Sequence, residues 1–206
     1  MPSDTLKFKN STRPQGMKRE DWNSAKGKVI EASKVANARF MAVLIHHRIA
    51  AGKKDKLFNW QLNKLLDEFH DNYLTWTHDD VGIVFLDRVG QGAECNLTKE
   101  MFAPDPASSR HSYPRIVGYA ATCNGASHIA SAADIVLGSF GYCVNQRGDL
   151  DVTKRLMRAV WPLIWHPEQS DVWGDGILLV PWNVTFRPYQ ADYRALFKHV
   201  NRLDGE

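Results

Sequence analysis

Residues 127–145, SHIASAADIVLGSFGYCVN, constrain the fold of this chain more than any other stretch. The pattern predicts a single helix in which Asp134 lies among small residues on one face, whereas the adjoining arc is apolar. The small neighbours of Asp134 on this face are Ser127, Ala130, Ser131, Gly138 and Gly141. Glycine inside a helix costs about 1 kcal/mol relative to alanine. The two glycines therefore indicate that something approaches this face closely, and the apolar arc predicts a helix buried over much of its girth.

The carboxylate of Asp134 has two interpretations. A carboxylate on a close-packed face is costly to bury alone, so it usually has a partner or binds a metal ion. The alternative is a side chain that pairs with an arginine or faces water. The pattern leaves both open.

Length and composition favour one globular domain. A chain of 206 residues with a net charge of +3 is large enough for a single core, and its charge argues neither for nor against nucleic acid. We expect one domain over residues 1–206, with residues 170–206 as an appended strand–helix unit.

No apolar run approaches about 18 residues and no leader is evident, which predicts a cytoplasmic protein without a membrane span. The three cysteines lack CxxC spacing, so we expect reduced thiols.

The hydrophobic pattern predicts an α/β fold. We expect strands over residues 4–10, 39–47, 81–87, 115–120 and 177–182, and helices over residues 19–37, 56–74, 127–145, 152–165 and 189–203. The apolar runs 39–47 and 81–87 are typical of strands buried on both faces, and the amphipathic helix between them predicts a crossover with parallel strands. The predicted architecture is a mixed central sheet with helices on both faces.

Two acids stand where a catalytic site would require them. Asp87 ends the strand 81–87, at the carboxyl edge where open α/β sheets bind ligands. If the fold brings Asp87 and Asp134 together, the pair would repel unless a divalent cation such as Mg²⁺ or Mn²⁺ held it, which is a common device for phosphoryl transfer to water. His46 and His47 end the strand 39–47, where either a site or an ordinary surface or core position fits. No GxGxxG, Walker A, HExxH or paired-cysteine zinc pattern occurs.

Four short segments of the chain resemble parts of the bacterial and phage DUF3800 family. Residues 127–138, S-H-I-A-S-A-A-D-I-V-L-G, are similar to its "S…Q-x-A-D-x-v-x-G" helix, and residues 84–88, V-F-L-D-R, to its "v-x-x-D-r" strand. Residues 4–10, D-T-L-K-F-K-N, resemble its "E-l-K" strand, and the segment from Trp182 through residues 193–196 resembles the tail of longer members. The resemblance implies an RNase H-like fold.

The chain also departs from the family pattern. The family opens with a strand that carries D-E-S-G and supplies the first acid of its site, and this chain begins near the third strand. Ser131 stands where glutamine is usual, and Thr5 where glutamate is usual, with Asp4 beside it as a substitute. We therefore expect an RNase H-like fold truncated at its N-terminal hairpin. The missing strand lies outside the sequence, has been lost together with catalysis, or is supplied by a partner chain.

The resemblance implies a metal-dependent nuclease or phosphoryl-transfer protein of the DUF3800 type that acts on DNA or RNA. Asp87 and Asp134 would be the catalytic residues and would hold Mg²⁺ or Mn²⁺ with help from Asp4. The expected contacts to nucleic-acid phosphates are Lys7, Lys9 and Arg88. Lys7 and Lys9 begin a basic stretch, residues 7–28, which carries seven Lys or Arg against two acids. That basic bias also fits an ordinary surface helix.

The alternative is a catalytically inactive RNase H-like module with a binding or regulatory role. It would dock a protein partner or nucleic acid, and the sheet edge left by the absent strand would be a natural place for a partner chain or a second copy of the protein.

Overall fold

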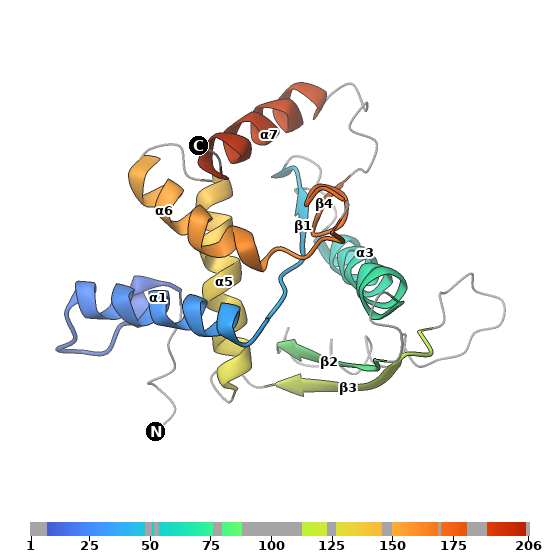
Figure 1. Cartoon of the computed structure of the whole chain (residues 1–206), viewed down its shortest axis with the longest axis horizontal. Coiled ribbons are helices and arrows are strands. Elements are labelled where there is room, and N and C mark those ends of the chain that lie inside the picture. Colours follow the sequence, from blue (N-terminus) through green and yellow to red (C-terminus); the bar gives the residue numbers. More distant parts are fainter. Residues whose placement is uncertain are drawn as a thin grey trace. The chain divides into compact units, whose positions relative to one another are not determined.

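The computed structural model describes residues 8–47, 51, 54–75, 80–87, 113–122, 127–145, 150–168, 170–180 and 189–204. The chain forms two compact units: the first comprises Met1–His46 and His128–Glu206, and the second comprises His47–Ser127. Each unit contains α-helix and one pair of parallel strands, so the protein is α/β (Figure 1). None of the helices in the described part of the chain is long and apolar enough to cross a membrane.

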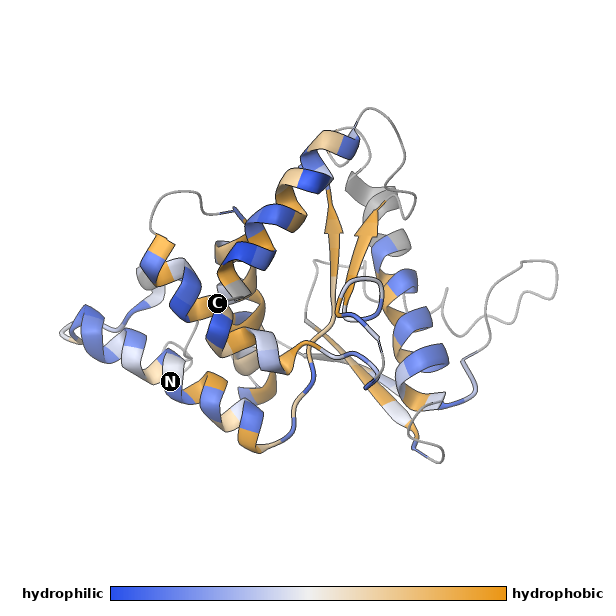
Figure 2. Ribbon diagram, turned by 45° about the horizontal axis from the view of Figure 1, so that its top comes forward, coloured by the Kyte–Doolittle hydropathy of each residue, from blue (hydrophilic) through white to orange (hydrophobic). Residues whose placement is uncertain are grey.

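In its described residues the first unit combines a two-stranded parallel sheet with four α-helices. Its elements are a 3₁₀ turn η1 (Asn10–Thr12), helix α1 (Arg19–Val35), strand β1 (Ala42–Ile45), helix α5 (His128–Asn145), helix α6 (Leu150–Val160), a 3₁₀ turn η3 (Trp161–Leu163), strand β4 (Ile177–Val180) and helix α7 (Gln190–Asp204). Ala42 pairs with Ile177 and Ile45 with Val180. Both strands are apolar along their length, as Figure 2 shows. β4 is buried at all four residues, whereas β1 is buried at Ala42 and half-buried at the other three.

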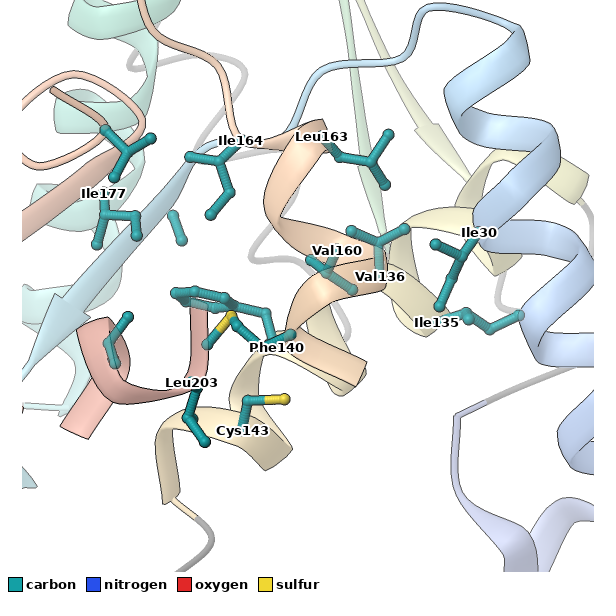
Figure 3. Packing of buried hydrophobic residues seen from close by; sticks show 14 residues of the cluster. Ile30, Ile135, Val136, Phe140, Cys143, Val160, Leu163, Ile164, Ile177 and Leu203 are labelled. Atoms are coloured by element: carbon teal, nitrogen blue, oxygen red, sulfur yellow. The ribbon is translucent and has the colours of Figure 1, made fainter. Parts of the chain in front are cut away.

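Helix α5 supplies much of the core of this unit. Its buried residues are Ile135, Val136, Ser139, Phe140 and Cys143. The Phe140 ring packs edge-on against Phe40, with 5.2 Å between the ring centroids. Figure 3 shows Phe140 and Cys143 gathered with side chains from β4, α6 and α7, including Val160, Ile177 and Leu203. Burial of these apolar groups is the main force that holds the helices on the sheet.

The predicted helix over residues 127–145 is confirmed, but its burial is narrower than expected. Ile129 is 76% exposed and Leu137 is 55% exposed. The buried face is centred on Ile135, Ser139 and Cys143. The prediction that the apolar arc beside Asp134 is buried is therefore only partly confirmed.

The second unit packs a helix against one face of its own parallel strand pair. Helix α3 (Lys54–Asp67) continues as a π-helical turn, η2 (Glu68–Leu74), and the strands are β2 (Gly82–Asp87) and β3 (Ile116–Thr122). Leu66, Leu74 and Ile116 form its core. A bulge between the pairs Gly82–Ile116 and Ile83–Gly118 lets Ile116 and Tyr119, three residues apart, both face this core.

The strand over residues 81–87 is not buried on both faces as predicted. Ile83 is 57% exposed and Phe85 is 60% exposed. The reason is that the described apolar cluster of the second unit covers only the face that carries Val84 and Tyr119.

The strand partners also differ from the prediction. The expected crossover joined residues 39–47 and 81–87, whereas β1 pairs with β4 and β2 pairs with β3. Both described pairs are parallel, and neither shows the mixed sheet that was expected. The expected strand over residues 4–10 is not found in its described part, because residues 8–9 form a bend and Asn10 begins η1.

The segment expected as an appended unit, residues 170–206, contributes to the core of the first unit. Strand β4 pairs with β1, and Val200 and Leu203 of α7 belong to the same apolar cluster as Phe140. The organisation of the chain as a single domain stays a prediction.

Candidate functional site

The carboxylate of Asp134 binds the main chain of Phe8. The backbone N–H of Phe8 donates a hydrogen bond of 2.8 Å to Oδ2 of Asp134. Asp134 lies on the exposed side of α5, opposite the core. Among the described residues, the partner of this acid is therefore a peptide group of the N-terminal segment, and the side chain is otherwise exposed, as one of the two interpretations expected.

Gly138 lies one helical turn after Asp134 and supports the ring of Phe8. A Cβ atom added to Gly138 would lie 2.4 Å from Cγ of Phe8, closer than carbon atoms approach without displacement. The predicted close approach is confirmed at this position. It is not found at Gly141, where a Cβ atom would meet nothing within 4 Å.

Lys26 of α1 binds the other polar group of the same residue. Its ammonium donates a hydrogen bond of 2.7 Å to the carbonyl oxygen of Phe8 and one of 3.3 Å to Oδ1 of Asn23. The Nζ atom also lies 5.4 Å from the centroid of the Phe8 ring, a cation–π distance. Lys26 is only 8% exposed, and this burial, together with the nearby charge of Arg19, lowers the pKa of its amine.

Trp22 lies one turn before Lys26 on the same face of α1. The Nζ atom of Lys26 is 5.7 Å from the centroid of the Trp22 ring. Trp22 is 2% exposed, and its indole N–H has no hydrogen-bond partner among the described residues. A buried donor without an acceptor is uncommon in folded proteins and costs stability.

We call these five residues and their contacts the Phe8 site. It consists of Trp22 and Lys26 from α1 and of Asp134, Gly138 and Tyr142 from α5, whose ring centroid lies 6.4 Å from that of Phe8. The site binds both polar groups of one main-chain residue and its aromatic ring.

The other predicted site residues are placed as follows. Asp87 is the last residue of β2, where its backbone is paired with Thr122 at the carboxyl end of the two parallel strands. It belongs to the second unit and Asp134 to the first. Lys9 is exposed, whereas Asp4, Lys7 and Arg88 lie outside the described residues.

Asp134 and Lys26 both contact the same residue, Phe8. No group of three His, Cys, Asp or Glu side chains that could hold a metal ion occurs in the described part of the chain. One oxygen of Asp134 already accepts an N–H, and the ammonium of Lys26 binds the same residue, Phe8.

His46 takes part in a second cluster, at the carboxyl ends of β1 and β4. Its Nε2 atom lies 3.3 Å from Oδ2 of Asp192. The hydroxyl of Tyr193 accepts a hydrogen bond of 3.3 Å from the backbone N–H of His46 and donates one to the carbonyl oxygen of Val180. These contacts tie the first turn of α7 to both strands, and burial raises the pKa of Tyr193.

A third cluster lies at the π-helical turn of the second unit. Nδ1 of His70 lies 2.7 Å from Oδ1 of Asp71, and the buried Nε2 of His70 has no partner among the described residues. The hydroxyl of Tyr113 donates a 2.7 Å hydrogen bond to Asp67. Burial and this bond raise the pKa of Tyr113.

The sequence interpretation missed Lys26 and the role of Trp22. One signal was present, because Lys26 follows Trp22 by four residues and so lies on the same face of the predicted helix as this large aromatic residue. Comparisons of the chain with protein-family models, with curated proteins and with solved structures find no match.

Proposed function

We propose that this chain is a non-catalytic module with an RNase H-like fold that binds a partner. The observation that carries this proposal is the hydrogen bonding of Asp134, one of the two acids on which the catalytic interpretation depends. Its Oδ2 atom accepts the N–H of Phe8, and the carbonyl of the same residue is bound by Lys26. An acid and a base from two helices thus hold one peptide residue, which is a structural and binding role.

The RNase H-like fold is part of this proposal. It is supported by the α/β architecture, by parallel strand pairs, and by an acid-ending strand, β2, whose residues 84–88 resemble the family strand.

The second candidate is a metal-dependent nuclease or phosphoryl-transfer protein of the DUF3800 type. It is favoured by the position of Asp87 at the carboxyl end of the parallel pair β2–β3, opposite Thr122. Asp87, Asp134 and Asp4 would then hold Mg²⁺ or Mn²⁺, which would supply charge neutralisation for the transferred phosphoryl group. Lys7, Lys9 and Arg88 would contact the phosphates of DNA or RNA.

Thermal unfolding separates the two candidates. The midpoint is measured in EDTA and in millimolar Mn²⁺ for the wild type, Asp134→Asn and Asp87→Asn. A binding module shows no metal-dependent rise, because a ligand stabilises the native state only if it binds that state. A rise of several degrees in the wild type that disappears in both variants would establish the carboxylate site and refute the non-catalytic proposal.

A comparison of Asp134→Asn with Asp134→Ala adds a second test. The asparagine amide oxygen still accepts the N–H of Phe8, whereas alanine has no acceptor. A binding role predicts that asparagine is tolerated and alanine is not. A metal ligand predicts that both variants lose metal binding equally.

A further inference from the structure

The Phe8 site has the properties of a receptor for a peptide. We propose that it docks a segment of a partner protein that carries an aromatic residue, and that Phe8 of the chain itself occupies the site as an intramolecular competitor. This inference rests on the proposed binding function and names the class of its partner.

The first argument is how the main chain of Phe8 is bound. Among the described residues its N–H is held by the carboxylate of Asp134 and its carbonyl by the ammonium of Lys26. Both groups are therefore bound by side chains and not by the backbone hydrogen bonds of a strand or helix. Every peptide segment has the same two groups, so the site recognises a backbone residue whichever chain supplies it.

The second argument is the selectivity for an aromatic side chain. The ring of Phe8 lies against the bare backbone of Gly138, and the ammonium of Lys26 lies 5.4 Å from its centroid. Tyr142 adds a tilted ring at 6.4 Å. A flat ring with a negative face fits between a glycine and a buried cation, and an aliphatic side chain lacks this electrostatic attraction.

The third argument is a donor that Phe8 does not use. The indole N–H of Trp22 is buried and has no partner in the described part of the chain. A backbone carbonyl oxygen, the acceptor that a peptide segment offers at each residue, can accept this hydrogen bond. A partner segment that bound Trp22 as well as Lys26 and Asp134 would make one more hydrogen bond than the described contacts of Phe8.

The competitor is tethered close to its site. Residues 9–18 join Phe8 to the start of α1, so the local concentration of Phe8 is in the millimolar range typical of short linkers. Phe8 is half-buried and Asp134 is exposed, which leaves the site open to exchange. A partner segment binds when its affinity for the site is high enough to compete with Phe8 at this local concentration.

The test uses the full-length chain with Phe8→Ala, which lacks the competing ring. A fluorescein-labelled peptide with the sequence of residues 4–12 is titrated with this protein, and fluorescence anisotropy is measured. We expect saturable binding that is at least tenfold weaker for a peptide with alanine in place of the phenylalanine. The wild-type chain should bind the labelled peptide at least tenfold more weakly than the Phe8→Ala chain, because its own Phe8 competes.

Two glycine variants provide the matched control. In the Phe8→Ala background, Gly138→Ala places a methyl group where the ring binds and should weaken the peptide at least tenfold. Gly141→Ala lies on the same helix, where a Cβ atom meets nothing within 4 Å, and should leave the affinity unchanged. The two changes have the same effect on helix propensity, so a difference between the peptide affinities of the two variants reports contact at the Phe8 site.

A second measurement needs no substitution at Phe8. Trypsin cleaves after Lys9, and a docked Phe8 protects the neighbouring bond. Cleavage should be at least threefold faster in Gly138→Ala than in Gly141→Ala.

Three results would overturn the proposal. One is equal binding of the phenylalanine and alanine peptides, and another is equal behaviour of the two glycine variants. The third is a wild-type dimer that becomes monomeric on Phe8→Ala substitution, which would assign the site to a second copy of the chain. A metal-dependent rise in the unfolding midpoint refutes the non-catalytic function instead, so the two failures are distinguishable.

Discussion

The N–H of Phe8 donates a hydrogen bond of 2.8 Å to the carboxylate of Asp134, a residue 126 positions later in the chain. This one contact joins the N-terminal segment to the helix with the most distinctive sequence in the protein. It also engages one oxygen of the acid that the second candidate function assigns to a metal ion. The four predictions below follow from the Phe8 site and from the contacts that hold α7 on the sheet.

Replacement of Asp134 tests the hydrogen bond itself. Asp134→Ala should lower the free energy of unfolding by about 1 kcal/mol, the usual net value of such a bond at an accessible position. Asp134→Asn should lose less, because its amide oxygen replaces the acceptor. Chemical denaturation of the three proteins measures the difference. Equal losses in the two variants would show that the charge of Asp134, and not its acceptor, is what matters.

Gly138→Ala should destabilise the protein although alanine is the better helix former. The added methyl group would lie 2.4 Å from Cγ of Phe8, and overpacking of this kind costs about 1–3 kcal/mol. Gly141→Ala should instead stabilise the protein by up to about 1 kcal/mol, because its methyl group meets no atom within 4 Å. Unfolding midpoints of both variants decide this. A stabilising Gly138→Ala would mean that the ring of Phe8 does not lie on this face.

Lys26 gives the protein a distinctive response to alkaline pH. Burial lowers the pKa of its amine below 10.5 in the folded state, so the unfolded chain binds more protons between these two pKa values. The Lys26 contribution to stability therefore rises as the pH increases through this window. Lys26→Met keeps the apolar stem and removes the charge, and the rise should be absent from its stability profile.

The measurement for Lys26 is the difference between the wild-type and Lys26→Met unfolding free energies from pH 8 to about pH 10.5, the pKa of free lysine. The difference removes the contributions of the other titrating groups. A difference that stays constant over this range would show that the amine is not buried.

Tyr193→Phe should cost about 1–3 kcal/mol, because it removes the hydroxyl that bonds the carbonyl of Val180 and the N–H of His46. Burial also raises the pKa of Tyr193 in the folded state, so the stability from this phenol is present below the unfolded pKa and is lost as the pH rises through the folded value. Denaturation at pH 7 and in the alkaline range measures both effects. An unchanged free energy of unfolding at pH 7 would show that α7 does not depend on this hydroxyl.

Local sequence patterns predicted the elements well. The helix expected over residues 127–145 is His128–Asn145, and the helix expected over residues 19–37 is Arg19–Val35. The strand over residues 81–87 is Gly82–Asp87. These predictions succeed because helix and strand periodicity is set by neighbouring residues.

Two features of the Phe8 site were also visible in the sequence. Gly138 on a helix face indicated a close approach, and Asp134 beside it indicated a partner. The identity of the approaching group was not visible, since Phe8 lies more than a hundred residues away and its flanking residues suggested a strand.

The sequence alone determined the α/β class, the positions of the main helices and strands, and the unusual character of the Asp134 face, because each depends on spacing along a short stretch. Only the tertiary structure decided which strands pair, which faces of β2 and α5 are covered, and which residue Asp134 binds. β1 lies beside β4, and Asp134 and Lys26 share the main chain of Phe8. The physical reason is that pairing and burial are set by contacts between distant segments, whose free energies depend on the whole packed unit and leave no periodic signal in either segment.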